Sequence, residues 1–363
     1  MHSSRDDIVP WLRLTLVPGV SPGIQRQLLK VFGSPHAVLG ATAREICAAA
    51  EDESVAPLLE KGPKKELLEA TLAWHETDGC HLITLADDQY PKALHNIHDP
   101  PAVLYARGRI EILNVPAFAI VGSRNATAQG LRDAEAFAFA LSEAGLAIVS
   151  GLALGIDASA HRGGLAGAGS SIAVMGTGAD RVYPRRNREL AHALAEKGCL
   201  ITEFPLGMPP DPANFPRRNR LISGLSRGVL VVEAGMPSGT LTTAKCALEQ
   251  GRDVFSVPGS IHSPLSKGCH WLIKEGAKLV ESADDVLEEL GLGRRQTPRE
   301  DTAHEGEERD PLLDAMGFAP ISIDQLYERT GLGADKLAAQ LSRLEIEGRV
   351  AALAGGWFQR TPE

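Results

Sequence analysis

The chain has 363 residues, 44% of them hydrophobic and 5% aromatic, and it carries a formal net charge of −9. This is the composition of an ordinary soluble globular protein, long enough for two or three domains. No apolar run approaches the roughly 20 residues of a membrane span, and the first residues lack the basic and apolar regions of a secretory signal, so we expect a cytoplasmic protein.

Residues 1–85 are expected to form a helical domain. The turn at residues 17–22 resembles the hairpin of a helix–hairpin–helix unit, a motif that can present backbone N–H groups to phosphate. However, Ser21 replaces the second glycine of the usual pattern, and residues 1–115 carry a net charge of −4. A structural domain is therefore favoured over one that grips DNA. The spacing of apolar residues predicts helices over Ile8–Leu16, Gly23–Phe32, Pro35–Leu39, Ala43–Ala49 and Lys64–Thr77.

Residues 86–290 carry the pattern from which the fold class is predicted. Short apolar runs recur about every 25–30 residues, and Ala-rich helical stretches such as Asp133–Ala144 and Glu189–Lys197 lie between them. Strands buried on both faces have this appearance, and the spacing fits βαβ units in a parallel sheet. The sequence therefore predicts an α/β domain with a doubly wound sheet. The predicted strands are Phe118–Val121, Leu146–Val149, Ile172–Met175, Leu200–Thr202, Val229–Val232 and Val254–Val257.

The positive charge of the chain is concentrated in this core. Residues 116–280 carry 17 basic and 13 acidic side chains, net +4, and form the only basic part of the sequence. The net charge of each domain is what bears on its partners. The overall value of −9 therefore does not argue against a nucleic-acid ligand.

Three core strands are followed by loops rich in glycine, serine and arginine, each leading into a helix. Residues 122–125 follow the first strand, residues 150–157 follow the second, and residues 238–243 come after the fifth. A helix N-terminus offers free backbone N–H groups and a positive dipole end to an anion, and Arg124 adds a forked cation suited to phosphate. Because these loops lie at the carboxyl edge of a parallel sheet, they are expected to converge on one crevice.

Two arginine clusters accompany the loops, one over residues 181–188 and one over residues 217–220. Tyr183 and Phe215 lie beside them and could stack on bases, which suits a single-stranded polynucleotide. Either feature alone could be a tight turn or a solvated surface. Their occurrence in one domain favours a ligand rich in phosphate.

The C-terminal part divides into a linker and a small domain. Gly291–Asp310 has almost no apolar residues and is expected to be a solvated acidic linker. Residues 311–363 then predict a winged helix, with two helices separated by Gly331-Leu332-Gly333 and an apolar hairpin at Val350–Phe358. We expect Ile323, Leu326 and Tyr327 to line one face of the first helix, and Leu337, Leu341 and Leu344 to line one face of the second. The second helix is poorly basic for a major-groove reader, so a protein-interaction or dimer-modulating role is favoured.

Several other chemistries find no support in the sequence. No G-x-x-x-x-G-K-[ST] segment occurs, and no G-x-G-x-x-G pattern follows the first core strand, which argues against a P-loop ATPase and a dinucleotide site. His95 and His98 are expected to be a turn pair rather than metal ligands. For Asp157 and His161, a capping or packing pair is favoured over a general base. The five scattered cysteines indicate reduced structural thiols, and we expect no cofactor and no metal.

Taken in order, these motifs resemble the DNA-processing protein A family (DprA, also called Smf), and the resemblance covers essentially the whole chain. One departure is His270, which stands where many relatives have asparagine. The matching residues are Tyr90-Pro91, Leu104-Tyr105, Gly122-Ser123-Arg124, Ser150–Asp157, His161, Tyr183-Pro184, Asn187, Glu203-Phe204-Pro205, Phe215–Ser226, Val232-Glu233-Ala234, Ser238-Gly239-Thr240 and Val257-Pro258-Gly259.

The resemblance implies an extended Rossmann-like domain behind a SAM-like helical domain, with a C-terminal winged helix. It also implies a homodimer that binds single-stranded DNA, protects it and loads the RecA recombinase during natural transformation. The segment 268–273 belongs to the region that the family uses for self-association and recombinase contact. The candidate DNA- and phosphate-binding residues are Gly122, Ser123, Arg124, Gly151, Phe215, Arg217, Arg218, Asn219, Arg220, Ser238, Gly239 and Thr240.

We therefore expect a DNA-binding protein that does not turn over a substrate. One phosphate is expected between the 123–124 and 238–240 loops, with the arginines of residues 217–220 tracking the next phosphates. One alternative is a Rossmann-like enzyme that hydrolyses nucleoside monophosphates, because Gly235–Thr240 partly resembles the loop of such enzymes and Glu233 precedes it. Another is a transcription regulator that acts through the winged helix, in which case deletion of residues 311–363 would abolish DNA binding.

Overall fold

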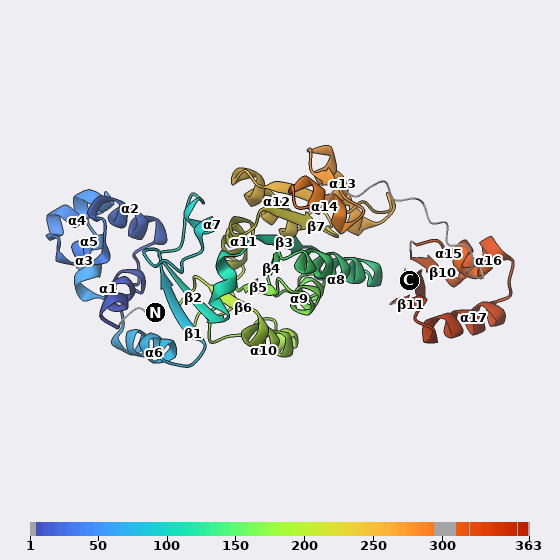
Figure 1. The fold of residues 1–363 in the computed structure, drawn as a ribbon, viewed down its shortest axis with the longest axis horizontal. Coiled ribbons are helices and arrows are strands. Elements are labelled where there is room, and N and C mark those ends of the chain that lie inside the picture. Colours follow the sequence, from blue (N-terminus) through green and yellow to red (C-terminus); the bar gives the residue numbers. More distant parts are fainter. Residues whose placement is uncertain (1–4, 294–309, 319, 354, 362–363) are drawn as a thin grey trace.

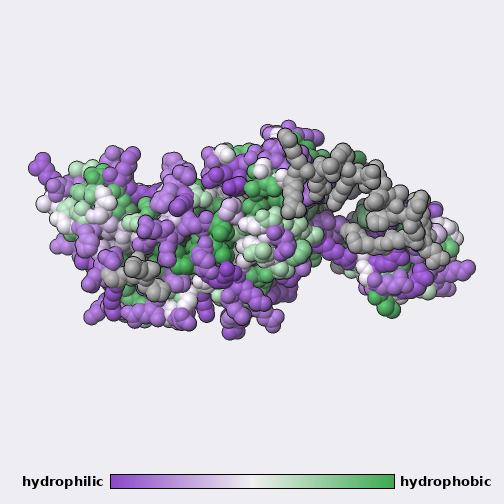
Figure 2. All heavy atoms as spheres, in the orientation of Figure 1, coloured by the Kyte–Doolittle hydropathy of each residue, from purple (hydrophilic) through white to green (hydrophobic). Residues whose placement is uncertain are grey.

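The structure, a computed structural model, describes residues 5–293, 310–318, 320–353 and 355–361 (Figure 1). It contains N-terminal helices, a central α/β domain and a small C-terminal domain. Most of the predicted linker, residues 294–309, lies outside the described residues. The face drawn in Figure 2 is mainly hydrophilic, with apolar side chains reaching the surface in patches over the central domain. No helix in the described ranges combines the length and the apolar character that crossing a membrane requires.

The five predicted N-terminal helices are confirmed, and a sixth, α5, is added. Ser21 caps α2 by accepting a hydrogen bond from the Ile24 N–H, and Pro22 occupies its first turn. The sequence does not announce α5, because it spans only 7 residues, contains Pro57 and has no side-chain cap. The helices are α1 (Arg5–Thr15), α2 (Pro22–Phe32), α3 (Pro35–Gly40), α4 (Ala43–Ala50), α5 (Val55–Lys61) and α6 (Lys65–His75).

A nine-stranded sheet forms the central domain, and all six predicted strands are confirmed within it. The spatial order is β1-β2-β6-β5-β4-β3-β7-β8-β9. The seven strands from β6 to β9 are parallel, while β1 and β2 run antiparallel at one edge. The strands are β1 (Cys80–Thr84), β2 (Val103–Gly108), β3 (Ala117–Val121), β4 (Ala147–Ser150), β5 (Ser171–Val174), β6 (Cys199–Thr202), β7 (Gly228–Val231), β8 (Asp253–Ser256) and β9 (Lys278–Leu279).

Both faces of the sheet are buried, which explains the continuous apolar runs. In β3, Phe118 and Ile120 belong to one core cluster and Ala119 and Val121 to another, as alternation along a strand requires. The helices of this domain are α7 (Lys92–His95), α8 (Ala128–Glu143), α9 (Ile156–Ala166), α10 (Arg188–Lys197), α11 (Asn214–Leu225), α12 (Gly239–Glu249), α13 (Lys267–Lys274) and α14 (Ala283–Glu289), with short 3-10 turns at Ile110–Asn114, Arg185–Asn187 and Pro264–Ser266.

The helical region and the sheet share one apolar cluster. Ile8 and Leu12 of α1 and Leu72 of α6 pack against Leu82 of β1 and Tyr105 of β2. Since β1 is hydrogen-bonded into the sheet, the sheet begins at Cys80, ahead of the predicted division at residue 86. We propose the limit between the first two domains just before this strand.

The order of the sheet creates one topological switch point. From β3 the chain proceeds outward on one side through β4, β5 and β6, and then returns to place β7 on the other side of β3. Ligand crevices in open α/β sheets form outside the carboxyl ends of the two strands where the order reverses. The loops after β3 and β7 are therefore the ones that flank the crevice.

The C-terminal residues form a winged helix, as predicted. Leu337, Leu341 and Leu344 form a buried apolar face, whereas on the preceding helix Leu326 is buried and Tyr327 is 56% exposed. The helix that carries it is only 8 residues long, and Leu326 supplies its buried contact. The elements are α15 (Pro311–Met316), β10 (Ile321–Ser322), α16 (Ile323–Thr330), α17 (Ala334–Ile346), β11 (Val350–Leu353) and β12 (Trp357–Arg360), with strand order β10-β12-β11.

Candidate nucleic-acid interface

A cleft of about 750 Å³ lies at the switch point. Its walls come from the loop after β3, the loop after β7, the start of α12, and the first turns of α11. Of the twelve candidate binding residues, nine line it: Gly122, Ser123, Arg124, Phe215, Arg218, Asn219, Ser238, Gly239 and Thr240. The two loops that were expected to hold one phosphate between them thus face the same cavity.

The first turn of α12 is the part of the cleft best suited to an anion. Ser238 is the N-cap residue, and its hydroxyl oxygen accepts a hydrogen bond from the Thr240 N–H at 3.2 Å. At Gly239 a side chain would meet no atom within 4 Å, so the cavity is open beside this turn. Helix N-termini leave backbone N–H groups without intrahelical partners and carry partial positive charge. This turn can therefore receive a phosphate oxygen.

A cation and two aromatic rings that line the same cleft lie in contact. The Arg124 guanidinium is placed over the Phe215 ring, 5.4 Å from its centroid. The centroids of the Tyr183 and Phe215 rings are 5.9 Å apart, and Tyr183 is 44% exposed. Because Arg124 itself is exposed, its charge is available to a ligand, and the exposed Tyr183 ring offers a stacking surface beside it.

The loop after β3 departs from the sequence expectation, because its helix N-terminus is already occupied. The Glu233 carboxylate accepts hydrogen bonds from the Thr127 N–H at 2.9 Å and from the Thr127 hydroxyl at 2.6 Å, at the start of α8. Burial raises the pKa of Glu233, and the Thr127 hydrogen bonds oppose the shift. A side chain at Gly130 would collide with this carboxylate. The chain therefore supplies its own anion at α8, and Ser123 and Arg124 contribute through their side chains.

Backbone N–H groups of the loop after β4 are likewise bonded to side chains of the protein itself. The Asp157 carboxylate accepts hydrogen bonds from the N–H groups of Gly151 and Ala153, at 3.1 and 3.3 Å. The Nε2 atom of His161 accepts one from the Leu152 N–H at 3.2 Å. These N–H groups are therefore not available to a phosphate. The favoured interpretation of Asp157 and His161 as a capping and packing pair fits these contacts.

Arg218 lines the edge of the cleft but is a buried structural residue. Its Nη1 atom donates to the carbonyl oxygens of Gly151 and Val174, both at 2.5 Å. Burial lowers the pKa of Arg218 to about 10, and the nearby Asp157 carboxylate opposes the shift. A side chain at Gly151 would collide with this guanidinium. Gly151 is thus needed for the approach of Arg218, and it does not line the cleft.

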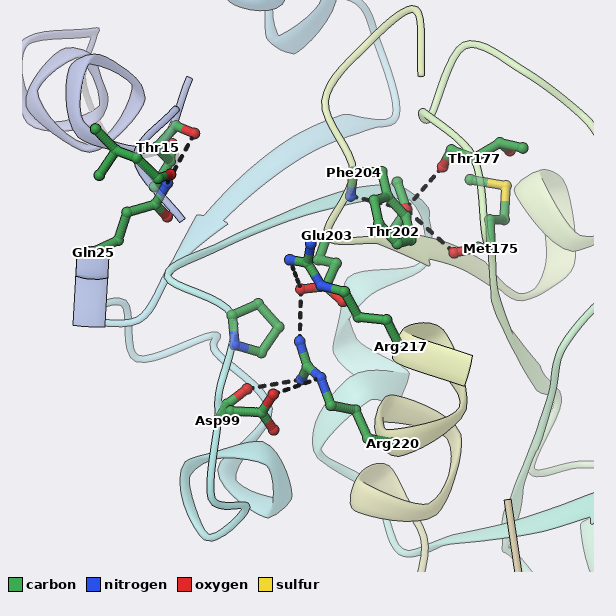
Figure 3. Close-up of polar contacts among 12 residues, drawn as sticks. Thr15, Gln25, Asp99, Met175, Thr177, Thr202, Glu203, Phe204, Arg217 and Arg220 are labelled. Atoms are coloured by element: carbon green, nitrogen blue, oxygen red, sulfur yellow. Dashed lines mark hydrogen bonds and ion pairs between the residues drawn. The ribbon is translucent and has the colours of Figure 1, made fainter. Parts of the chain in front are cut away.

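Arg217 and Arg220 do not line the cleft, and their side chains extend from α11 toward Glu203 (Figure 3). Their Nη2 atoms meet one oxygen of the Glu203 carboxylate, at 2.7 and 2.6 Å. Arg220 also pairs with Asp99 at 3.0 Å, and Arg217 lies over the Phe204 ring, 5.2 Å from its centroid. Since Arg220 is buried, these contacts do not fit the expectation that residues 217–220 track successive phosphates.

The other arginine cluster remains accessible. Arg185, Arg186 and Arg188 are exposed beside Tyr183 and make no ion pair within the described residues, while Arg181 lies 3.9 Å from Asp180.

Sequence reasoning missed the proline-rich loop that contributes Pro210 and Pro212 to the cleft wall. Its only signal was the Pro-rich composition after the Glu203-Phe204-Pro205 motif. His95 packs on the Tyr90 ring at 4.7 Å, and the described ranges contain no histidine, cysteine and carboxylate group suited to a metal ion.

The buried His161 makes the stability of the protein depend on pH. Burial lowers its pKa to about 3, and the positive charges of Arg218 and Arg162 act in the same direction. An unfolded histidine titrates near 6.5, so below that pH the unfolded state binds a proton that the folded state refuses. Stability is therefore complete above about pH 6.5 and falls as the pH drops toward 3.

Lowering the pH from 7.5 to 5.5 is expected to remove about 1.4 kcal/mol of unfolding free energy through this histidine. The change should be smaller by this amount in the His161→Gln variant, which lacks the titrating group. Urea denaturation of both proteins at both pH values measures it. Identical pH dependence in the two proteins would contradict the assignment.

Comparison with known sequences gives a consistent result. Residues 81–291 match the family model described as DNA recombination-mediator protein A, and residues 296–356 match the DprA winged helix domain. Protein Smf of Escherichia coli is 43% identical over 306 residues, which covers 82% of this chain and 82% of that protein. Protein Smf of Synechocystis is 35% identical over 391 residues, covering 96% and 98%.

Solved structures agree with this comparison. DNA processing protein A from Streptococcus pneumoniae superimposes with a TM-score of 0.69 at 36% identity, covering 80% of this chain and 99% of that one. DNA processing protein A from Helicobacter pylori, whose structure describes a single-stranded DNA binding mode, gives a TM-score of 0.53 at 29% identity. It covers 58% of this chain and 95% of that one.

Proposed function

Since the chain belongs to the DprA/Smf family of DNA recombination-mediator proteins, we propose that it binds single-stranded DNA in the cleft at the switch point. The observation that carries the proposal is the placement of Arg124, the first turn of α12 and the Tyr183 ring around one cavity. Cation, oriented N–H groups and aromatic ring together match a nucleotide unit, with its phosphate and its base.

In the proposed complex a phosphate lies between Arg124 and the Ser238–Thr240 turn. Both contacts hold the backbone without reading sequence, so binding tolerates any base order. A base stacks on Tyr183, with Phe215 behind it. Because stacking requires a base free of its partner strand, this arrangement selects single strands over duplex.

The exposed arginines extend this site. Arg185, Arg186 and Arg188 lie next to Tyr183 on the surface, and we propose that they neutralise the phosphates of the strand leaving the cleft. In this role they replace Arg217 and Arg220, which Glu203 already holds. Release of counterions from several phosphates makes affinity fall steeply with salt.

The proposed activity is binding without turnover. Glu233, the acidic residue that the hydrolase alternative requires, is held by Thr127 and does not line the cleft. His161 is buried and accepts a backbone hydrogen bond, which removes it as a general base. Both observations favour a ligand-binding cleft over a catalytic one.

We further propose that the bound strand is protected and handed to the RecA recombinase, and that the protein acts as a homodimer in the cytoplasm. The family description as a recombination mediator supports the transfer. Trp271, which lies within the 268–273 segment, and Ile261, which precedes the segment, are exposed apolar side chains. Their exposure supports self-association through this region. In that segment the Nε2 atom of His270 lies 3.0 Å from the Gly259 carbonyl oxygen, so His270 stabilises the loop before α13.

Titration of labelled single-stranded against double-stranded DNA tests the proposed function, and a clear preference for the single strand is expected. Deleting residues 311–363 is expected to leave single-strand affinity within about twofold. The physical reason is that Arg329, Arg343 and Arg360 of the winged helix are engaged by its own carboxylates or carbonyls. Loss of all DNA binding on deletion would instead favour a regulator that binds through the winged helix.

A further inference from the structure

A second, larger cavity lies between the N-terminal helices and the edge of the sheet. Its volume is about 920 Å³. One wall consists of α1, α2 and the start of α3, and the other of the loops at residues 84–87 and 98–100. This cavity does not involve the hairpin at residues 17–22, and it shares no lining residue with the cleft at the switch point.

The wall formed by α2 presents two cations that have no ion-pair partner in the part of the chain that the structure describes. Arg26 and Lys30 are four residues apart, so they lie on the same face of the helix, and both line the cavity. Arg26 is half-buried, and burial is the largest influence lowering the pKa of its guanidinium. The Asp99 carboxylate, which pairs with Arg220, raises the pKa of Arg26 through its charge. Neither Arg26 nor Lys30 has an ion pair or a side-chain hydrogen bond among the described residues. A half-buried guanidinium without an acceptor is unfavourable unless a ligand supplies one.

The other polar residues that line the cavity leave Arg26 and Lys30 available to a ligand. Two carboxylates also line the cavity, Asp7 and Asp87, and neither is free. Asp87 accepts a hydrogen bond from the Thr84 N–H at 2.6 Å. His36 and His98 add two exposed imidazoles, and the half-buried Trp11 adds a flat apolar surface. The cavity thus combines unpaired cations with an aromatic ring, the two features that hold a nucleotide unit.

We propose that this cavity is a second binding site for a phosphate carried by a nucleotide, with Arg26 and Lys30 as its anion contacts and Trp11 beside the base. The phosphate belongs either to a free nucleotide or to a DNA strand. The proposal does not depend on the cleft function. Helix α11 separates the two sites, because Phe215 and Asn219 line the cleft while Arg220 acts electrostatically on Arg26.

The test uses the full chain carrying Arg124→Ala, which weakens the cleft, and follows quenching of tryptophan fluorescence. The probes are adenosine 5′-monophosphate, a hexathymidylate and, as a phosphate-free control, adenosine. Adding Arg26→Gln or Lys30→Gln is expected to weaken binding of a phosphate-bearing probe about tenfold, the size of one lost charged hydrogen bond. Arg44→Gln, an exposed arginine of α4 outside the cavity, is the matched control and should leave the affinity unchanged. Trp11→Phe should remove the quenching.

Each outcome decides the proposal. Equal binding of the monophosphate and the hexathymidylate assigns a free nucleotide, and binding of the hexathymidylate alone assigns a strand backbone. The proposal is overturned if neither probe binds, if adenosine binds as well as its monophosphate, or if Arg26→Gln and Lys30→Gln behave like Arg44→Gln. Thermal unfolding of the variants separates these results from misfolding. Failure of the cleft function would appear separately, as single-strand binding that Arg124→Ala leaves unchanged.

Discussion

Replacing Arg124 by alanine is expected to weaken single-stranded DNA binding about tenfold and to do so equally for all sequences. Arg124 is the exposed cation of the cleft, and it lines the same cavity as the first turn of α12. Loss of one phosphate contact should also flatten the dependence of log affinity on log salt by roughly 0.7. Filter binding or anisotropy at several salt concentrations measures both quantities.

The matched control is Arg132→Ala, which removes an exposed arginine of α8 that does not line the cleft. It should leave the salt slope unchanged and affect affinity little, because it does not line the cleft in which the phosphate is proposed to bind. If the two variants give the same affinity and the same slope, Arg124 is not part of the site. A sequence-dependent loss would point to base reading, which the proposed phosphate contact does not provide.

Replacing Arg218 by alanine is expected to lower the free energy of unfolding by about 3–5 kcal/mol. The side chain is buried, donates to two carbonyl oxygens, and is the main favourable charge beside the buried Asp157. Its removal leaves the two carbonyl acceptors without this donor and the buried Asp157 without its compensating positive charge. Urea denaturation at pH 7.5 measures the loss.

Arg185→Ala is the control for this effect, since Arg185 is exposed and unpaired among the described residues. Its unfolding free energy should change by no more than about 0.5 kcal/mol, while its DNA affinity falls. The two arginines are thus expected to separate stability from binding. A stable Arg218→Ala protein with weakened DNA binding would contradict the structural role.

Much of the fold could be predicted because its signals are local. The continuous apolar run of β3 and the β-branched runs of its neighbours mark strands that are buried on both faces, regardless of what packs on them. Short elements could not be predicted, because they carry no strong local signal. The helix α5 has no side-chain cap at its N-terminus, and β9 has only 2 residues, so tertiary packing rather than local preference stabilises them.

The candidate site was predicted in part. The Ser123–Arg124 and Ser238–Thr240 loops do meet, because carboxyl ends of parallel strands share one edge. The arginines at 217–220 were expected to act together, yet on a helix consecutive side chains point in different directions. Arg218 therefore turns inward toward Gly151, while Arg217 and Arg220 meet Glu203.

By itself, the sequence determined the longer elements of the fold, the basic character of the central domain and the strand ends that carry loops. Only the tertiary structure decided which loops stay open to a ligand. Glu233 fills the start of α8 from 106 residues away, and Arg218 reaches Gly151 across 67 residues. Such long-range partners leave no periodic trace in the chain. They satisfy buried polar groups whose neighbours are fixed only by packing.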